Sequence, residues 1–274
     1  MYQNLELDGP RKTVPSYLSR VWRFRHLGLN LAGSDLRARF RRSRLGIIWA
    51  VVQPMGFAIL IALVWGQLFG GDTWSYAIYV MSGLLVWEYF SNSVLVGMDS
   101  LTNAEGYIKQ TRIPFLTFQL RTPMTGFVVF LLGNAGLFIL MAVLSDLPRL
   151  GWHLLLVPVF PFLLFGLVAP LAVVVSIMGT QFRDLKHATQ LLLTATFFLS
   201  PVMLAREYLA NERVGFLAFV NPVIPLLDLY RAPILHDTFW SLQPLLVVLG
   251  WIAGLSVIAV LVTRAVGRRI IFAL

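Results

Sequence analysis

Two groups of charged residues stand out in an otherwise apolar sequence. Glu88 is a carboxylate within the apolar stretch 76–98, where it lies in the segment Trp87-Glu88-Tyr89-Phe90-Ser91-Asn92-Ser93. Four arginines fall within residues 38–44, and residues 45–69 directly after them carry no charge. A carboxylate inside a bilayer is costly unless it faces water or a partner. Glu88 is therefore either a polar group that lines a channel, or a structural hydrogen-bonding group or protonated side chain within the bundle.

Motifs for catalysis or nucleotide binding are missing from the sequence. Lysine occurs only at positions 12, 109 and 186, and none of these ends a G-x-x-x-x-G-K-[ST] pattern that could hold ATP. The four histidines (His26, His153, His187 and His236) show no ligand spacing, and there is no cysteine for a disulfide or a metal site. We therefore expect no catalytic residue, no bound metal and no cofactor in this chain; an intramembrane enzyme or a scaffold is a minor alternative.

The composition indicates an integral membrane protein. Hydrophobic residues make up 58% of the chain and charged residues 13%, whereas soluble domains carry about 25% charged residues. The net charge of +9 is concentrated at the start, because ten of the 22 lysines and arginines lie in residues 1–46. This distribution fits a topology signal and contact with anionic membrane lipids, and it argues against nucleic acid as a partner.

Hydropathy predicts an all-α membrane fold with six transmembrane helices. The expected spans are residues 46–69, 76–98, 115–144, 153–178, 188–204 and 244–263. Pro54 is expected to kink the first span, and the third is expected to break near residues 123–126. Seventeen lysines and arginines lie in the segments that would share one side of the membrane: the N-terminal tail, the loops 99–113 and 179–187, and the C-terminus. The other loops carry 4. Both termini are therefore predicted to be cytoplasmic.

The segment before the first span divides into several predicted parts. Residues 1–15 are expected to be a mobile part of a cytoplasmic tail covering residues 1–33, and residues 16–27 are expected to form a short helix. Gly28 and Gly33 bracket an expected break. Ser34 is then the predicted N-cap of an amphipathic interface helix over residues 34–45, which opens the transmembrane domain of residues 34–274. An ordinary positively charged flank is the alternative for this helix.

Two connecting segments and one aromatic series have candidate roles. Residues 99–113 favour a short cytoplasmic helix that docks on a partner, or else a solvated connection. Residues 205–242 favour short re-entrant or interfacial helices at the external face. Aromatic side chains can stack on sugars, or they can serve packing and interfacial belts. The candidate channel-lining residues are Trp49, Gln53, Phe57, Tyr76, Tyr79, Trp87, Glu88 and Phe90.

The order of several motifs resembles the membrane subunits of the ABC exporters of cell-surface polysaccharides, the O-antigen, capsule and teichoic acid permeases. The most specific part is the basic helix followed by Leu45-Gly46-Ile47-Ile48-Trp49 and Gln53-Pro54. Supporting segments are 83–87 (GLLVW), 183–185 (RDL), 200–202 (SPV), 221–222 (NP) and 228–231 (DLYR). Glu88 departs from the family pattern, in which an uncharged residue is expected.

The resemblance implies a homodimeric channel in the bacterial inner membrane, with two separate ABC ATPase subunits that hold ATP and magnesium. Its substrate would be an undecaprenyl-diphosphate-linked glycan. The arginines that could meet the diphosphate where the substrate enters are Arg37, Arg39, Arg41, Arg42 and Arg44, which could equally serve topology and lipid contact. The coupling helix on the ATPase would include Leu101, Thr102, Asn103, Glu105, Tyr107, Ile108 and Lys109. An ABC efflux permease for drugs or small lipids is the alternative.

Overall fold

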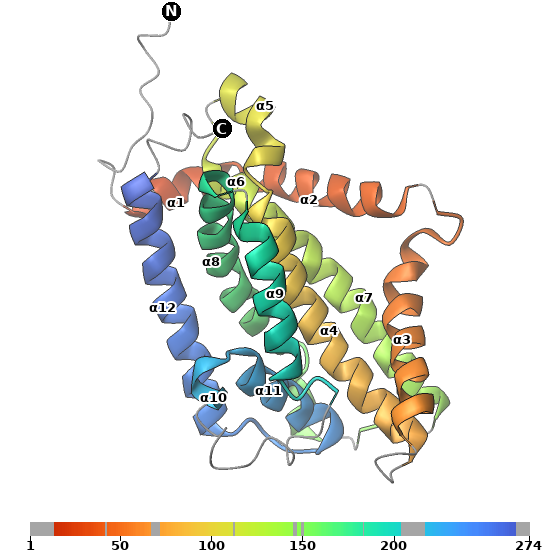
Figure 1. Cartoon of the computed structure of the whole chain (residues 1–274). Coiled ribbons are helices and arrows are strands. Elements are labelled where there is room, and N and C mark those ends of the chain that lie inside the picture. Colours follow the sequence, from red (N-terminus) through yellow and green to blue (C-terminus); the bar gives the residue numbers. More distant parts are fainter. Residues whose placement is uncertain are drawn as a thin grey trace, which may run out of the picture.

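Long helices run side by side through the molecule, with shorter helices at both ends (Figure 1). The computed structural model describes residues 14–41, 43–66, 72–111, 113–144, 147–148, 151–182, 184–203 and 217–266. The long helices are α3 (Trp49–Trp65), α4 (Thr73–Met98), α7 (Arg121–Val143), α8 (Phe160–Gln181), α9 (Leu185–Phe198) and α12 (Leu242–Val266). No strand occurs among the described residues, so the prediction of an all-α fold is confirmed.

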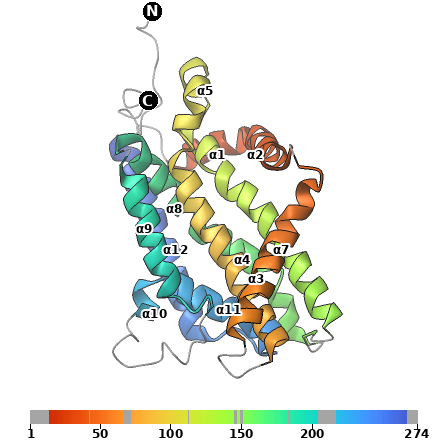
Figure 2. The same ribbon diagram turned by 45° about the vertical axis from the view of Figure 1, so that its right-hand side comes forward.

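The two ends of the bundle carry different short elements. Helices α1 (Val14–Arg23) and α2 (Arg25–Phe40) lie across one end, and α5 (Glu105–Gln110) projects from the same end (Figures 1 and 2). Helices α10 (Leu217–Val220) and α11 (Val223–Leu235) lie at the opposite end. Helix α12 finishes beside α1, so both described ends of the chain share the end that carries α2 and α5.

Four helical segments are long and apolar enough to cross a membrane among the described residues: Gly46–Trp65, Phe115–Val143, Trp152–Gln181 and Leu242–Ala265. They correspond to the predicted first, third, fourth and sixth spans. Helix α4 has sufficient length but carries polar residues, and α9 has only 14 residues. The helices expected for the second and fifth spans are therefore present, while the count of six crossings stays a prediction.

The N-terminal segment differs from the prediction. Helix α2 runs without a break through Gly28 and Gly33, so the expected break and the Ser34 N-cap are wrong. Gly28 is buried, and a Cβ there would lie 3.5 Å from a side-chain carbon of Thr117. Its small size lets α2 approach α6 (Phe115–Gln119) closely, which outweighs its low helix propensity. The helix also ends at Phe40 rather than at residue 45, and the expected boundary between residues 33 and 34 falls inside it.

The break in the third span lies earlier than predicted. The helix is interrupted at Leu120, between α6 and α7, and not at residues 123–126. Pro123 lacks the N–H that would bond the carbonyl of Gln119, so the proline disturbs the turn before itself. Pro54 and Pro170 lie inside α3 and α8, which continue past them.

The short helices at the end opposite α2 agree with the prediction of short helices within residues 205–242, because α10 and α11 both lie in that segment. Their re-entrant or interfacial placement at the external face stays a prediction. The intervening residues 204–216 lie outside the described part of the chain, as do residues 1–13 and 67–71.

Helix α4 occupies the centre of the bundle. It packs against α3, α7, α8, α9 and α11, and most of its side chains are buried. Asp72 caps its first turn, since Oδ2 accepts a hydrogen bond from the Ser75 N–H at 2.9 Å. This bond lowers the pKa of the Asp72 carboxyl. Because α4 is packed between other helices, these helices separate its polar residues from lipid.

Arg231 of α11 ties three elements together in the interior. It is 4% exposed, and its Nε donates to Ser82 Oγ at 3.0 Å. Its Nη1 donates to the Pro201 carbonyl at 2.6 Å, and Nη2 donates to the carbonyls of Tyr79 and Val202 at 3.0 and 3.1 Å. The guanidinium also lies 3.7 Å from the centroid of the Tyr79 ring. We call Arg231 with these four residues the Arg231 cluster; it joins α4, the turn after α9 and α11.

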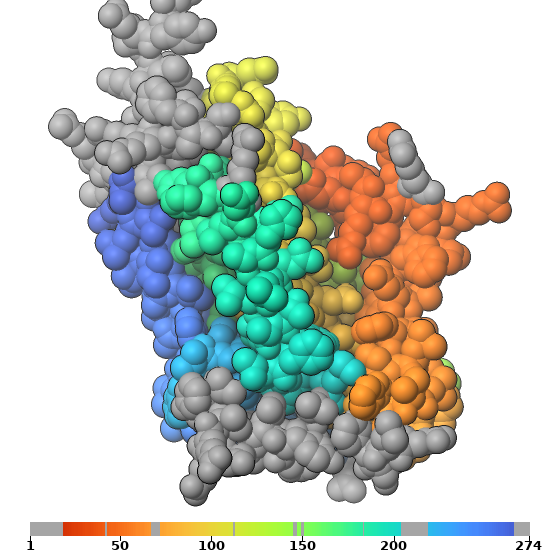
Figure 3. Space-filling view, in the orientation of Figure 1, coloured from red at the N-terminus to blue at the C-terminus, as the bar shows by residue number. Residues whose placement is uncertain are grey.

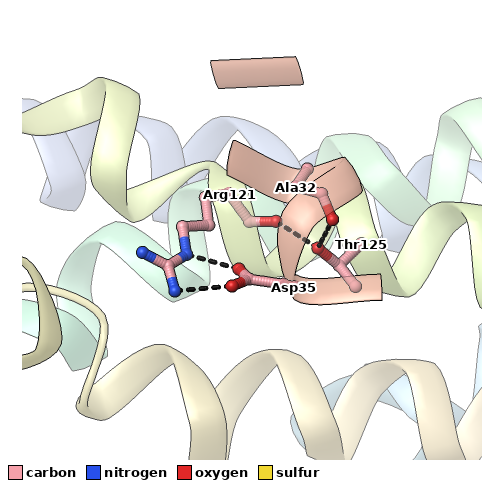
Figure 4. A network of polar contacts seen from close by, with 4 residues as sticks. All are labelled: Ala32, Asp35, Arg121 and Thr125. Atoms are coloured by element: carbon pink, nitrogen blue, oxygen red, sulfur yellow. Dashed lines mark hydrogen bonds and ion pairs between the residues drawn. The ribbon is translucent and has the colours of Figure 1, made fainter. Parts of the chain in front are cut away.

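Helix α2 is fastened to α7 by a second polar contact. Arg121 binds the Asp35 carboxylate through two nitrogens, with Nη2 to Oδ1 at 2.6 Å (Figure 4). Thr125 donates to the Ala32 carbonyl at 3.2 Å in the same place. The two charged side chains are 20% and 30% exposed, so water screens their attraction only in part. This contact fixes α2 across the end of the bundle.

Removing one partner of the Asp35–Arg121 pair should loosen α2. We expect Asp35→Asn to destabilise the purified protein by about 1–3 kcal/mol, since it removes a two-point charged hydrogen bond. Lys109→Gln is the matched control, because the exposed Lys109–Glu105 pair contributes only about 0.2–0.5 kcal/mol. Thermal unfolding in detergent would measure both; equal small effects would contradict a pinning role for the pair.

The Arg231 cluster predicts a strict size limit at Gly83. A Cβ at this position would lie 2.4 Å from the Val202 carbonyl oxygen and 2.6 Å from Arg231 Nη2. We expect Gly83→Ala to lower the unfolding free energy by about 1–3 kcal/mol through overpacking. Gly106→Ala is the control, because nothing lies within 4 Å of its added Cβ. There the change should be neutral or stabilising, and a stable Gly83→Ala protein would contradict the close approach.

Candidate functional site

A pocket opens between four helices beneath α2. It is shallow, with a cavity volume of about 20 Å³, and its polar lining consists of Arg39, Glu88 and Asn92. Its apolar lining consists of Ala50, Leu85, Tyr89, Gly126, Val129 and Phe130. We call this the α2 pocket. It brings together a predicted headgroup arginine, Arg39, and a predicted channel-lining residue, Glu88.

Helical spacing explains how one side of α4 builds the pocket. Leu85, Glu88, Tyr89 and Asn92 are three or four residues apart and therefore share one face of the helix. Tyr89 is held in place because its hydroxyl donates to the Pro123 carbonyl at 2.9 Å and its ring packs on that of Phe130. The apolar wall is thus fixed, while the charged and amide groups face the cavity.

The charged side chains of the α2 pocket interact with each other. Arg39 is exposed and attracts the half-buried Glu88 carboxylate electrostatically. The guanidinium of Arg39 lies 5.7 Å from the centroid of the neighbouring Phe40 ring. The pocket therefore combines a cation and a carboxylate that already attract each other.

The remaining predicted headgroup arginines lie outside this pocket. Arg37 and Arg41 are exposed on and just after α2, and Arg44 is exposed in the turn that leads to α3. The guanidinium of Arg37 folds back toward Gly33. Arg42 lies outside the described residues. The arginines surround the end of the bundle, but only Arg39 lines the pocket that the described residues form.

The aromatic series of α4 faces other helices. The hydroxyls of Tyr76 and Tyr79 donate to the carbonyls of Met203 and Pro201 at 3.0 and 3.2 Å. The Trp87 ring contacts Phe197 of α9 at 5.3 Å between centroids. Phe90, also expected to line a channel, is buried in the core. In the single chain this series forms a contact between α4, α9 and the following turn, so its role in lining a channel stays a prediction.

The predicted residues of the first span face outward. Trp49, Gln53 and Phe57 are exposed on α3, and exposed polar residues also occur on α9, at Gln190 and Thr194. The space-filling view shows the surface hollowed between α3 and α9, with α4 lying deeper (Figure 3). This concave face of the molecule is therefore flanked by helices that carry exposed polar groups.

The segment 99–113 contains the short helix that the sequence predicted, and its residues divide into two groups. Leu101, Ala104 and Ile108 are buried and pack with residues of α6, α8 and α12, namely Phe118, Val173, Ile177 and Ala259. The residues that face outward are Thr102, Asn103, Tyr107 and Lys109, while Glu105 is half-buried. Tyr107 is 55% exposed at the projecting end of the molecule. Leu101 and Ile108 therefore anchor the segment, and its polar residues remain available.

An ion pair joins this segment to the next loop at the same end. Lys186 Nζ lies 2.5 Å from Asp99 Oδ2, and both side chains are almost half exposed. This contact shows that the loop at residues 179–187 lies close to the segment 99–113. Arg183 of that loop lies outside the described residues.

Sequence reasoning missed three features of these sites. Asn92 could have been found because it lies four residues after Glu88, on the same helical face. The Asp35–Arg121 pair joins residues 86 positions apart, and no local pattern connects them. The burial of Arg231 was also missed, since an arginine near the external face is normally expected in solvent.

The chemistry that these groups can perform is binding rather than bond breaking. Among the described residues no group of three histidine, cysteine or acidic side chains could hold a metal ion. Arg39 can pair with an anion through its planar fork of donors, and Glu88 and Asn92 can hydrogen-bond hydroxyl groups. The α2 pocket therefore suits a ligand that carries both an anion and hydroxyls.

Comparison with known proteins shows similarity along most of the chain, although no protein-family model matches it. The O-antigen export system permease protein RfbA of Myxococcus xanthus is 25% identical over 241 residues, which cover 85% of this chain and 92% of that protein. RfbA of Klebsiella pneumoniae is 23% identical, covering 83% and 88%. The polysialic acid transport protein KpsM of Escherichia coli is 17% identical, covering 73% and 78%. These matches confirm the resemblance: the chain is related to the permease subunits of ABC exporters of cell-surface polysaccharides.

Proposed function

We propose that this chain is the permease half of an ATP-driven exporter that moves a lipid-linked polysaccharide across the bacterial inner membrane. The observation that carries this proposal is the alignment with O-antigen export permeases over 85% of the chain and 92% of the relative. Such coverage extends far beyond a single shared motif. The chain is a transport subunit, and an ABC ATPase partner supplies ATP hydrolysis.

In this proposal the chain crosses the membrane six times, so both termini lie on the same side, which is the cytoplasm. Helix α4 is about 39 Å long, at 1.5 Å per residue, and its central position shields Glu88 and Asn92 from lipid. Helix α9 is about 21 Å long, and the turn to Met203 extends it toward the external end. The positive-charge bias supports assigning the end with α1, α2 and α5 to the cytoplasm.

Two ATPase subunits and a second copy of this chain complete the exporter. The projecting α5, with its buried anchor and exposed polar residues, is suited to sit in a groove of the ATPase. The amide side chains of Gln53 and Gln190 are exposed on α3 and α9, where lipid offers them no hydrogen-bond partner. A second copy facing this surface would enclose a polar path for the glycan between the two chains.

Loss of the gene tests the transport function. We expect deletion to abolish surface polysaccharide and to leave lipid-linked glycan inside the cell, because no other route carries it outward. Immunoblotting of surface glycan and extraction of the lipid-linked pool would measure both, with the restored gene as control. Normal surface glycan together with new drug sensitivity would overturn the proposal in favour of drug efflux.

The outward residues of α5 predict where the ATPase binds. We expect Tyr107→Ala to weaken co-purification of the ATPase by about tenfold, since exposed aromatics often anchor interfaces. The bundle should stay folded, because Tyr107 is not part of the buried anchor. Trp152→Ala is the control, as Trp152 is an aromatic residue 80% exposed, in a short helical turn at residues 152–156 that contacts α11. Equal ATPase recovery from both variants would refute docking through α5.

A further inference from the structure

Helix α9 is held to the rest of the chain by polar contacts at its two ends. Within the helix only Leu193 is buried, and most of the other side chains are exposed. At the end of the bundle that carries α5, Lys186 pairs with Asp99 (Figure 1). At the opposite end, two carbonyls of the turn after α9 accept hydrogen bonds from Arg231. These two contacts differ in strength, and the difference determines how α9 can move.

The contact at the end opposite α5 is buried and consists of several hydrogen bonds. In addition to the bonds from Arg231, the hydroxyls of Tyr76 and Tyr79 donate to carbonyls of the same turn. Asn221 Nδ2 donates to Ser200 Oγ at 2.8 Å, and both residues are buried. Separating these groups would leave buried donors and acceptors without partners, which is costly. This end of α9 therefore stays attached to α4 and α11.

The contact at the other end is a single exposed ion pair. The side chains of Lys186 and Asp99 are 46% and 41% exposed, and ion pairs in contact with water contribute little to stability. The Asp99 side of the pair is fixed, because a Cβ at Gly179 would lie 2.4 Å from the Met98 carbonyl oxygen. The last turns of α4 and α8 are thus in close contact, and the ion pair joins α9 to this rigid base.

Both charges of the pair lie where the helix dipole disfavours them. Asp99 is the C-cap residue of α4, at the negative end of that helix. Lys186 lies in the first turn of α9, at the positive end. Neither charge stabilises its own helix, and their mutual attraction offsets this disadvantage. The two residues are therefore suited to the contact between α4 and α9 and not to the helices that carry them.

We infer that the Asp99–Lys186 pair is a latch that opens during transport and lets α9 pivot on the Arg231 cluster. Asp99 begins the segment that leads to α5, since its carbonyl accepts a hydrogen bond from the Asn103 N–H at 2.8 Å. A displacement of α5 therefore reaches the latch directly. The connection from α8 to α9, residues 182–184, is short and keeps the swinging end of α9 near α8. The opening of the latch during transport rests on the proposed function.

Hydrogen exchange of the full-length purified chain in nanodiscs tests the latch without transport. We expect Asp99→Asn to speed amide exchange at residues 188–192 about two- to fivefold, because this end of α9 loses its tie to α4. In a Lys186→Gln background the same change should have no effect on α9. Exchange in α11 should stay as in the wild type. Lys109→Gln is the control, because it breaks a pair of similar exposure within α5.

The exchange pattern separates the latch from the pivot. Unchanged exchange in Asp99→Asn, or the same acceleration in the Lys186→Gln background, overturns the latch. Acceleration that extends through α11 overturns the pivot on the Arg231 cluster.

A reversible tether tests whether the latch opens during transport. The chain has no cysteine, so Asp99→Cys with Lys186→Cys can be joined by a short bismethanethiosulfonate linker that replaces the two side chains. We expect export to fall about tenfold or more when the linker is in place and to return after reduction. Before linking, this variant should export, because α9 can still swing.

The control carries the same linker within α9. His187→Cys and Leu191→Cys are exposed and four residues apart, so the linker joins them without tying α9 to α4. Export should stay unchanged there, and co-purification of the ATPase checks that both tethered complexes assemble. Undiminished export with residues 99 and 186 joined, equal loss in both tethered variants, or loss of export before linking overturns the inference.

The outcomes also separate this inference from the proposed function. If hydrogen exchange changes as expected but gene deletion leaves surface glycan intact, the export function fails and the latch on α9 remains. If deletion abolishes surface glycan while the tether between residues 99 and 186 leaves export unchanged, only the opening of the latch fails.

Discussion

Helix α4 has to remain out of contact with lipid, and much of the structure follows from this requirement. It carries Glu88, Asn92 and several hydroxyl groups through a bundle of largely apolar helices, where each unpaired polar group costs free energy. Neighbouring helices cover most of it, and the Arg231 cluster hydrogen-bonds its backbone near the external end. Among its described polar groups, Glu88 and Asn92 line the α2 pocket half-buried, and Ser93 Oγ is buried without a hydrogen-bond partner within the described residues.

Local patterns predicted the helices well because hydropathy and proline positions act over short distances. The predicted second, third, fourth and sixth spans coincide with long helices, and the short helices near residues 105–110 and 217–235 were expected as well. The errors arose where tertiary packing overrides propensity, as at Gly28 and Gly33. Glycine there indicated a break, but α2 is continuous through both residues, and Gly28 is buried where α2 packs on Thr117 of α6.

The sequence identified single residues of the candidate sites, but not which of these residues lie together. Arg39 and Glu88 were each identified, with no means to know that they line one pocket, because 49 positions separate them and the folding of α2 over the bundle decides their proximity. That folding depends on the Asp35–Arg121 pair, which has no sequence signature. Conversely, the aromatic series of α4 was correctly placed on one helix, but its contacts with α9 follow only from the three-dimensional arrangement.

The short length of α9 limits the thickness of the hydrocarbon core that the helix can match. Its 14 residues reach about 21 Å, while the hydrocarbon core measures about 30 Å and the 22 residues of α8 match it. A bilayer becomes locally thinner beside a hydrophobic helix that is shorter than its hydrocarbon core, at a cost of fractions of a kcal/mol per Å of mismatch. The hydrocarbon layer beside α9 would therefore be thinner than the layer beside α8, so a hydrophilic polymer that moves along α9 would have a shorter apolar distance to cross.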